Sequence, residues 1–199
     1  NATFTAEGLA RSPVIKGSMG KFPTFRDSKQ DTPYKFDDLP PDAKAIATEL
    51  RNMQESNPNY REVFIGYKDG GYAMSFAETL VPAGTDMSKR SWYLSCTASP
   101  KDSSLGEVYQ NIKGDMVVCT TTKVKDADGQ LIGVLGIDLA LTNLTETIGK
   151  MRLGDSGRFI LIEHTGRLIC SPQTPDLVGK VIGKDFRHEA LERLQNSPD

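Results

Sequence analysis

Residues 116–139, MVVCTTTKVKDADGQLIGVLGIDL, carry the clearest structural pattern in the chain. Their two ends, 116–124 and 131–139, are rich in β-branched and apolar residues, a composition that favours strands. Between them, Asp126-Ala127-Asp128-Gly129 favours a tight turn of the kind that joins antiparallel strands. The stretch therefore predicts a β-hairpin.

The segments before this hairpin extend it into a sheet. Residues 61–67 and 72–76 are strand candidates on either side of a Gly-rich turn, and residues 91–97 are a third candidate. Apolar residues at helical spacing predict a helix that begins near Asp42 and ends before Asn57. Five antiparallel strands flanked by helices predict an α+β fold with the helices on one face of the sheet.

Two other regions complete the layout. A helical pattern runs to Ile15 with an interruption near Pro13, and the turn-forming residues of 20–41 predict a long surface connection. The strand–turn–strand pattern then recurs over residues 158–170, and a helical segment follows at 185–195. This repeat predicts two related modules in tandem, the second incomplete, unless the similarity is fortuitous.

The composition narrows the classes of function. The 199 residues are 38% hydrophobic and 25% charged, with a net charge of −2, which argues against a protein that coats nucleic acid or an anionic membrane. No stretch approaches the roughly 20 apolar residues that span a bilayer, and no signal peptide is visible. Both ends are those expected of a part cut from a longer protein, so membrane anchors are expected outside this sequence.

The tetrapeptide Arg90-Ser91-Trp92-Tyr93 contains the chain's one tryptophan. In a strand, Arg90 and Trp92 would point to one face of the sheet and Tyr93 to the other. A guanidinium binds a carboxylate through two parallel hydrogen bonds, and Trp and Tyr provide flat walls with polar tips. The group is a candidate for binding a ligand carboxylate, but an arginine at a sheet edge above a core tryptophan would leave the same pattern.

Asp138 lies inside an otherwise apolar run, residues 131–141. A carboxylate there is expected to be partly buried, and burying it without a partner is costly. The partner is either internal, such as Arg90 or the backbone of a following helix, or the ammonium group of a ligand. Arg90 for a carboxylate and Asp138 for an amine would together form a pocket for a small zwitterion.

No catalytic or metal-binding constellation is visible. His164 and His188 lack the spacing of metal ligands, and the chain contains no nucleophile motif, P-loop or dinucleotide fingerprint. The odd cysteine count, with Cys96, Cys119 and Cys170, does not form a zinc site or a disulfide framework. A bond between Cys96 and Cys119 stays open beside the alternative of buried free thiols. We expect no catalysis, no metal and no cofactor.

In order and spacing, three stretches resemble the double Cache (dCache) family of bacterial chemoreceptors, sensor kinases and cyclases: residues 64–70, 86–93 and 128–138. The resemblance implies tandem PAS-like modules, with antiparallel sheets, on a long N-terminal helix. It divides the chain into the end of that helix with a connection, a membrane-distal ligand-binding module, and the start of a membrane-proximal module: residues 1–40, 41–150 and 151–199.

The resemblance also implies which residues bind the ligand. Arg90, Trp92 and Tyr93 match the family's Arg-x-Trp-Tyr element, and Asp138 matches the aspartate at the end of the last distal strand. We expect the first three to hold a ligand carboxylate. Asp138 and Asn111 are then expected to hold the polar or cationic end of the ligand.

Two positions depart from the family's pattern. Residues 108–111, Val-Tyr-Gln-Asn, resemble its Pro-Tyr-x-Asp element, which adds Tyr109 to the site and places Asn111 where the family has an acid. Thr85 stands where the family has a tyrosine. An amine that faces Asp138 and a neutral Asn111 meets less compensating charge than one between two carboxylates, so a different amine or an organic acid remains open.

These features predict a periplasmic or extracellular sensing domain of an inner-membrane receptor, of the methyl-accepting chemotaxis or sensor-kinase type. The domain is expected to bind an amino acid, an amine or a small carboxylate, to have no nucleic-acid partner, and to form a homodimer in the full receptor. The alternative is a ligand-free module for interaction or dimerisation, which the departures at Thr85 and Asn111 would favour.

Overall fold

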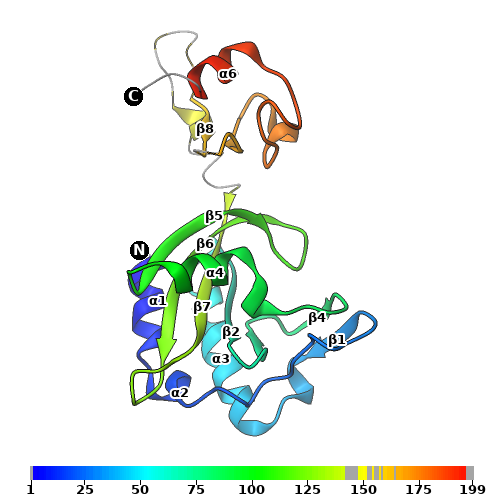
Figure 1. Ribbon diagram of the computed structural model, residues 1–199, viewed down its shortest axis with the longest axis vertical. Helices are drawn as coiled ribbons and strands as arrows, with labels where there is room; N and C mark the ends of the chain where they lie inside the picture. Colours follow the sequence, from blue (N-terminus) through cyan, green and yellow to red (C-terminus); the bar gives the residue numbers. More distant parts are fainter. Residues whose placement is uncertain are drawn as a thin grey trace. The chain divides into compact units, whose positions relative to one another are not determined.

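The chain is divided into two compact units in a computed structural model that describes residues 2–141, 148–151, 154, 157, 159–163 and 165–195 (Figure 1). One unit comprises Asn1–Gly106 with Gln110–Leu139, and the other comprises Glu107–Tyr109 with Ala140–Asp199. Among the described residues, no helix is both long enough and apolar enough to cross a membrane.

The first unit is built around a five-stranded sheet with the strand order β3-β2-β7-β6-β5. The strands span Tyr72–Met74 (β3), Tyr60–Tyr67 (β2), Leu131–Ala140 (β7), Met116–Lys125 (β6) and Ser103–Gln110 (β5). Strand β2 pairs antiparallel with both β3 and β7. The predicted β6–β7 hairpin is confirmed, with Gly129 at a φ of 80° in its turn. Such a positive φ is readily accessible only to glycine.

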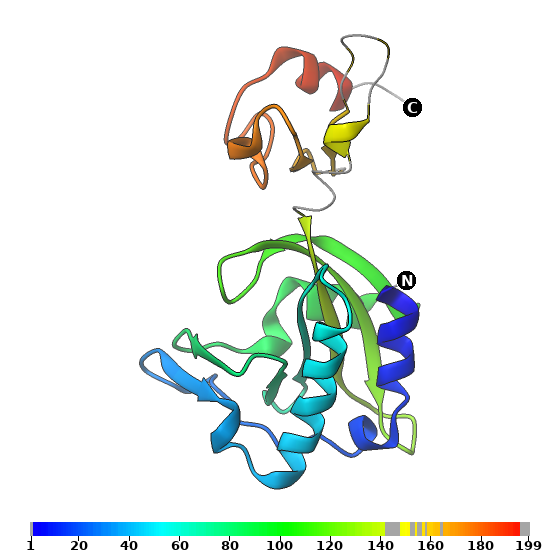
Figure 2. The same ribbon diagram turned by 180° about the vertical axis from the view of Figure 1, so that it is seen from behind.

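Helices cover both faces of this sheet, so the prediction that they lie on one face is wrong. Figure 2 shows α1 (Ala2–Ala10) and α3 (Pro41–Glu55) on one side, whereas α4 (Ser91–Ala98) lies on the opposite side in Figure 1. The physical reason is visible in β2, where the consecutive residues 63–67 are all buried. Because successive side chains of a strand point to opposite faces, continuous burial requires cover on both.

The segment 91–97, predicted as a strand, is the helix α4. Trp, Tyr and Thr favour strands, and a seven-residue segment is too short for periodicity to override that preference. The buried residues Trp92, Tyr93 and Cys96 nevertheless follow helical spacing. Consequently Trp92 and Tyr93 do not lie on opposite faces of a sheet; their rings contact each other, with centroids 5.7 Å apart.

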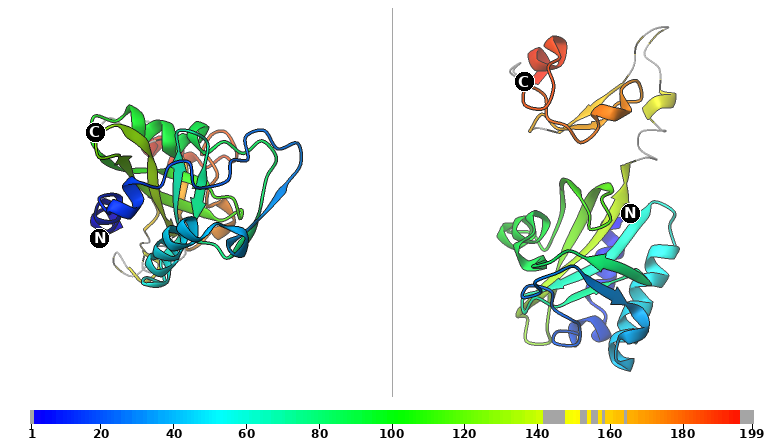
Figure 3. Two further views of the ribbon diagram at one scale, coloured as in Figure 1. Left: turned by 90° about the horizontal axis from the view of Figure 1, so that it is seen from below. Right: turned by 90° about the vertical axis from the view of Figure 1, so that its right-hand side faces the viewer.

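The sheet's true edge strand, β5, and a separate two-stranded ribbon were not predicted. In the ribbon, β1 (Thr32–Lys35) pairs antiparallel with β4 (Glu78–Val81), to one side of the main sheet (Figure 3). The region 20–41 is therefore more than a surface connection, because it contributes β1 and buries Phe22, Phe25 and Tyr34.

The remaining elements agree with the predictions where they are described. The α2 helix (Pro13–Lys16) follows the predicted interruption, and all three cysteines are free thiols. In the second unit, β8 (Leu161–Ile162) pairs antiparallel with β9 (Leu168–Cys170), and α6 (Glu189–Gln195) follows. Arg158 and His164 of the predicted second hairpin lie outside the described residues.

Candidate functional site

One face of the sheet in the first unit combines acids with aromatic rings. On β2, Glu62 and Phe64 are two residues apart, so their side chains share a face, and the β2–β7 register sets Asp138 opposite Glu62. Phe64 meets Trp92 of α4 edge to face, with ring centroids 4.9 Å apart. This is therefore the face of the sheet that α4 covers.

Two glycines allow the close packing of this face. A Cβ atom at Gly66 would lie 2.8 Å from Cη2 of Trp92, and one at Gly136 would lie 2.4 Å from Cζ of Phe64. Both distances are far below van der Waals contact. Glycine at these two positions lets the Trp92 and Phe64 rings rest directly on the backbone, next to the acids Glu62 and Asp138.

Glu62 and Asp138 form a buried pair of carboxylates, with 1% and 0% of their surfaces exposed. The expectation that Asp138 is buried is confirmed. Burial, followed by the negative charge of Asp138, raises the pKa of Glu62 to about 8. The hydroxyl of Tyr72 donates a hydrogen bond of 2.6 Å to Oε1 of Glu62, which opposes the rise, as do the charges of Lys113 and Arg90.

Glu62 is the residue that the sequence reasoning missed. It is a carboxylate within the apolar strand 61–67, the same pattern that singled out Asp138 in the strand 131–141. The same pattern therefore marks Glu62, although the family's pattern has its second acid at the position of Asn111. In the structure, a second acid reaches Asp138 from the neighbouring strand instead.

Arg90 and Asn111 flank this face. Arg90 lies just before α4, and its Nη2 donates a hydrogen bond of 2.8 Å to the carbonyl oxygen of Gln110. Asn111, the next residue, accepts hydrogen bonds through Oδ1 from the backbone N–H groups of Lys113 and Asp115, at 2.9 and 3.0 Å. Asn111 therefore holds the turn between β5 and β6.

The Nδ2 group of Asn111 has no hydrogen-bond partner among the described residues, although the residue is only 6% exposed. Leaving a buried donor unsatisfied costs about 1–3 kcal/mol. The Lys113 ammonium lies 3.7 Å from the ring centroid of Phe76, and its charge acts on Glu62. Asn111 binds the backbone of Lys113 and directly follows Gln110, the residue that Arg90 binds. It therefore lies at the edge of the face that carries Glu62 and Asp138.

Tyr34 approaches the same group from β1. Burial raises its pKa to about 12; the positive charge of Arg51 lowers the pKa, and the negative charge of Glu62 raises it further. The hydroxyl of Tyr34 is buried and has no hydrogen-bond partner among the described residues. A polar group without a partner among the described residues therefore lies within electrostatic range of Glu62.

The structure brings most of the predicted site residues into one unit. Arg90, Trp92 and Tyr93 cluster at the start of α4, and Asn111 and Asp138 belong to the same unit. Burial raises the pKa of the Tyr93 hydroxyl. Tyr109 lies on β5 but is grouped with the second unit, so the arrangement described above is built without it.

Thr85 does not substitute for the tyrosine of the family's pattern. Its hydroxyl is used locally, in a hydrogen bond of 2.6 Å to the carbonyl oxygen of Pro82.

No group of three or more His, Cys, Asp or Glu side chains suited to a metal ion occurs among the residues that the structure describes.

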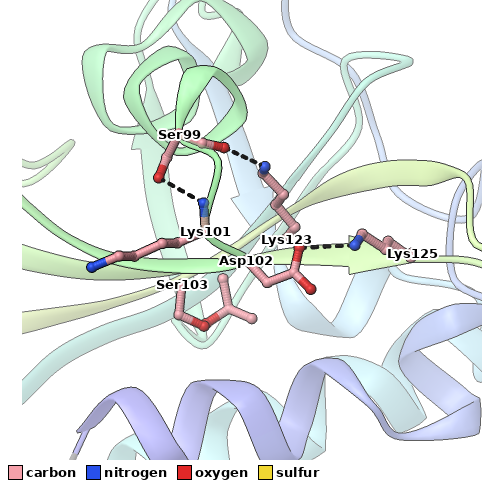
Figure 4. A network of polar contacts seen from close by, with 7 residues as sticks. Ser99, Lys101, Asp102, Ser103, Lys123 and Lys125 are labelled. Atoms are coloured by element: carbon pink, nitrogen blue, oxygen red, sulfur yellow. Dashed lines mark hydrogen bonds and ion pairs between the residues drawn. The ribbon is translucent and has the colours of Figure 1, made fainter.

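A hollow of about 140 Å³ lies beside α1 and is lined by Arg11, Lys123 and Lys125 among others. Two of its cations, Lys123 and Lys125, have partners within the protein (Figure 4). The ammonium of Lys123 donates a 2.7 Å hydrogen bond to the carbonyl oxygen of Ser99, and Lys125 forms an ion pair with Asp102 at 2.8 Å. These contacts fasten the end of α4 to the β5–β6 edge, which makes a structural role the simpler account of this hollow.

Comparison with known proteins points to one family. The sequence pattern of the Cache domain matches residues 15–195. The chain is 32% identical over 115 residues to the methyl-accepting chemotaxis protein McpA of Pseudomonas putida, covering 57% of this chain and 18% of that protein. The chain spans about a fifth of the length of the curated relatives it matches first.

Two solved structures share the fold. The ligand-binding domain of the Pseudomonas fluorescens chemoreceptor CtaA, in complex with L-serine, matches with a TM-score of 0.64 at 23% identity, over 94% of this chain and 71% of that one. The ligand-binding domain of the Pseudomonas aeruginosa amino acid chemoreceptor PctC, in complex with GABA, matches with a TM-score of 0.64 at 22% identity, over 92% and 72%.

Proposed function

Because the chain belongs to the Cache domain family, we propose that it is the extracytoplasmic small-molecule-sensing domain of a transmembrane receptor. The curated relatives are methyl-accepting chemotaxis proteins, which favours chemotaxis as the output of the full receptor. Sensing requires binding and not catalysis, and a ligand changes the receptor only through its different affinity for the two signalling states.

The observation that carries the proposal is the buried charged group under α4. Glu62 and Asp138 lie side by side with aromatic rings around them, and Arg90 lies at the edge. Proteins rarely bury two adjacent carboxylates for stability alone, because each must be desolvated and the two repel each other. Perturbed acids inside a fold are instead typical of binding and catalytic sites.

We assign the ligand's two ends to opposite sides of this group. Arg90, with Trp92 and Tyr93 as walls, holds a carboxylate, since a planar guanidinium can bind a carboxylate through two parallel hydrogen bonds. Asp138 and Asn111 hold the polar or cationic end. Tyr109 of β5 remains a proposed ligand-binding residue on the family's pattern alone.

An amino acid or a related amine fits this assignment best. The solved relatives were crystallised with L-serine and with GABA, two zwitterions that differ in the spacing of ammonium and carboxylate. Two acids in the present chain, Glu62 and Asp138, favour a ligand with a cationic group over a plain carboxylate.

The wider architecture is proposed on the family pattern. Residues 41–150 form the membrane-distal module, residues 151–199 begin the membrane-proximal module, and residues 1–40 contain the end of the long helix. The receptor acts as a homodimer in the inner membrane, with the sensing domain on the periplasmic side. These assignments place the ligand site in the distal module.

A thermal-shift screen tests the proposal. The domain is screened against amino acids, amines and small organic acids, together with Arg90→Ala, Asp138→Asn and the matched surface control Asp128→Asn. A ligand at 100 times its Kd adds about 2.7 kcal/mol of stability, which is a readily visible shift. We expect a hit that Asp138→Asn abolishes and Asp128→Asn preserves. A folded protein that responds to no compound favours the ligand-free interaction module.

A further inference from the structure

Glu62 and Asp138 are close enough for their negative charges to repel each other when both side chains are ionised. The two residues are direct partners in the β2–β7 register, and side chains in this position have Cβ atoms about 4.5–5.5 Å apart. Both are almost completely buried. Two carboxylates this close, away from water, cannot both be ionised without a large electrostatic cost.

The groups that face Glu62 come from five elements. They are Asp138 on β7, Tyr72 on β3, Tyr34 on β1, Lys113 in the β5–β6 turn and Arg90 before α4. The Tyr72 hydroxyl binds one carboxyl oxygen of Glu62, which leaves the other oxygen able to carry a proton. The balance of these groups favours the protonated acid: burial and Asp138 raise the pKa of Glu62 to about 8 despite the two cations.

We propose that Glu62 determines specificity for cationic ligands by exchanging its proton for them: the empty site holds a carboxylic acid, and a ligand's cationic group replaces that proton. This inference rests on the proposed ligand-binding function and names the class of ligand. The step is balanced, since the proton passes to water or buffer and the cation takes its place between two carboxylates. No bond other than the O–H bond of Glu62 is broken.

Two features independent of the acids support a bound cation. Aromatic rings share the face of the sheet that carries the pair: Phe64 lies 4.9 Å from Trp92 and 6.2 Å from Tyr72, measured between ring centroids. Aromatic faces attract ammonium groups, and such rings beside carboxylates are how proteins recognise amines. The Tyr34 hydroxyl is also buried without a hydrogen-bond partner among the described residues, and its oxygen can accept a hydrogen bond from a ligand's ammonium group.

The exchange makes affinity depend on pH in a defined direction. Below a pKa of about 8, Glu62 must lose its proton before it can pair with the ligand, so binding tightens as pH rises. Well below this pKa, the affinity for the ligand rises almost tenfold for each pH unit. Between pH 6 and pH 8 it rises on the order of fiftyfold in total. Aliphatic ammonium groups keep their charge across this window, as lysine does.

The test uses matched pairs of compounds that differ in the cationic group: 4-aminobutyrate and butyrate, L-alanine and propionate, 1,4-diaminobutane and 1,4-butanediol. Calorimetry at pH 6, 7 and 8, in phosphate and in HEPES, counts the protons released from their different ionisation heats. We expect the wild-type domain to bind a cationic member, to release up to one proton below pH 8, and to prefer it over its neutral counterpart. Glu62→Gln should weaken that binding at least tenfold at pH 8 and remove the pH dependence, whereas the exposed control Glu55→Gln should change neither.

The outcomes separate this inference from the proposed function. A cationic compound that binds without proton release, or equal binding of both members of a pair, overturns the role of Glu62 and leaves small-molecule sensing intact. Failure of every compound here and in the wider screen overturns both. If Glu62→Gln does not fold, as judged by circular dichroism, the proton count on the wild-type domain decides the matter without it.

Discussion

Replacing Glu62 with glutamine should stabilise the empty domain at high pH while impairing its ability to bind a cation. The substitution keeps the shape of the side chain and its acceptor for Tyr72, which donates to Oε1 at 2.6 Å. It replaces the ionisable carboxyl group with an amide that cannot lose a proton in this pH range. The change therefore isolates the electrostatic cost of the buried acid.

The loss of stability caused by the buried acid at high pH follows from the pKa of Glu62, which is about 8 in the folded protein against an ordinary value of 4.5. An acid whose pKa is higher in the folded chain binds more protons when folded. Stability therefore falls as pH rises from 4.5 to about 8, and it levels off above that value. At about 1.4 kcal/mol per pKa unit, the loss amounts to about 5 kcal/mol.

Urea unfolding, followed by fluorescence, measures this directly. Trp92 is the chain's one tryptophan and is 4% exposed, so its emission reports on the first unit. Wild type, Glu62→Gln and the exposed control Glu55→Gln are compared at pH 5, 6.5 and 8. We expect Glu62→Gln to match the wild type at pH 5 within about 1 kcal/mol, and to exceed it at pH 8 by several kcal/mol. Parallel pH profiles for wild type and Glu62→Gln would refute the reasoning.

Three further changes probe the same face. Gly136→Ala places a Cβ 2.4 Å from the Phe64 ring and should destabilise the domain by about 1–3 kcal/mol in urea unfolding, with partial recovery in the double variant with Phe64→Leu. Asn111→Ala removes the acceptor for two backbone N–H groups of the β5–β6 turn and should cost about 1–3 kcal/mol by the same assay; an unchanged midpoint would contradict that role. Arg90→Ala should weaken the binding of carboxylate-bearing ligands by about 10- to 100-fold in calorimetry, and should leave the binding of 1,4-diaminobutane nearly unchanged.

The elements predicted correctly are those whose pattern is local. Strand β7 is a continuous apolar run beside a Gly-containing turn, and α3 buries Ala43, Ile46, Ala47 and Leu50 at helical spacing. Strands whose partners are distant were missed. Strand β1 contains a proline and pairs with residues more than forty positions later, and β5 is largely polar. Nothing within either segment distinguishes it from a loop.

The error at α4 shows why composition alone misleads. Its residues, SWYLSCTA, are mostly strand formers, yet the backbone is helical because Trp92 and Cys96 must both reach the sheet from one side. The chemistry proposed for Arg90 and Trp92 did not depend on that error, since both still lie at the start of the element. The expected geometry was wrong, because the rings of Trp92 and Tyr93 contact each other instead of pointing to opposite faces of a sheet.

Of the two buried acids in the site, the sequence predicted Asp138 but not Glu62. Asp138 could be singled out because an acid in an apolar run must find a partner. Its neighbour Glu62 is separated from it by 76 positions in the sequence, and only the β2–β7 register sets the two side by side. The charge of the site is a property of that pairing, which single-strand patterns do not contain.

Titration of Trp92 fluorescence with the compound identified in the screen tests the central claim most directly. Trp92 packs against Phe64 on the face that carries Asp138, so a ligand bound there should change its emission in a saturable way. The account predicts that Asp138→Asn loses this response and that the surface control Asp128→Asn keeps it. A ligand that stabilises the domain equally in both variants, without altering Trp92 emission, would show that the protein binds its ligand elsewhere.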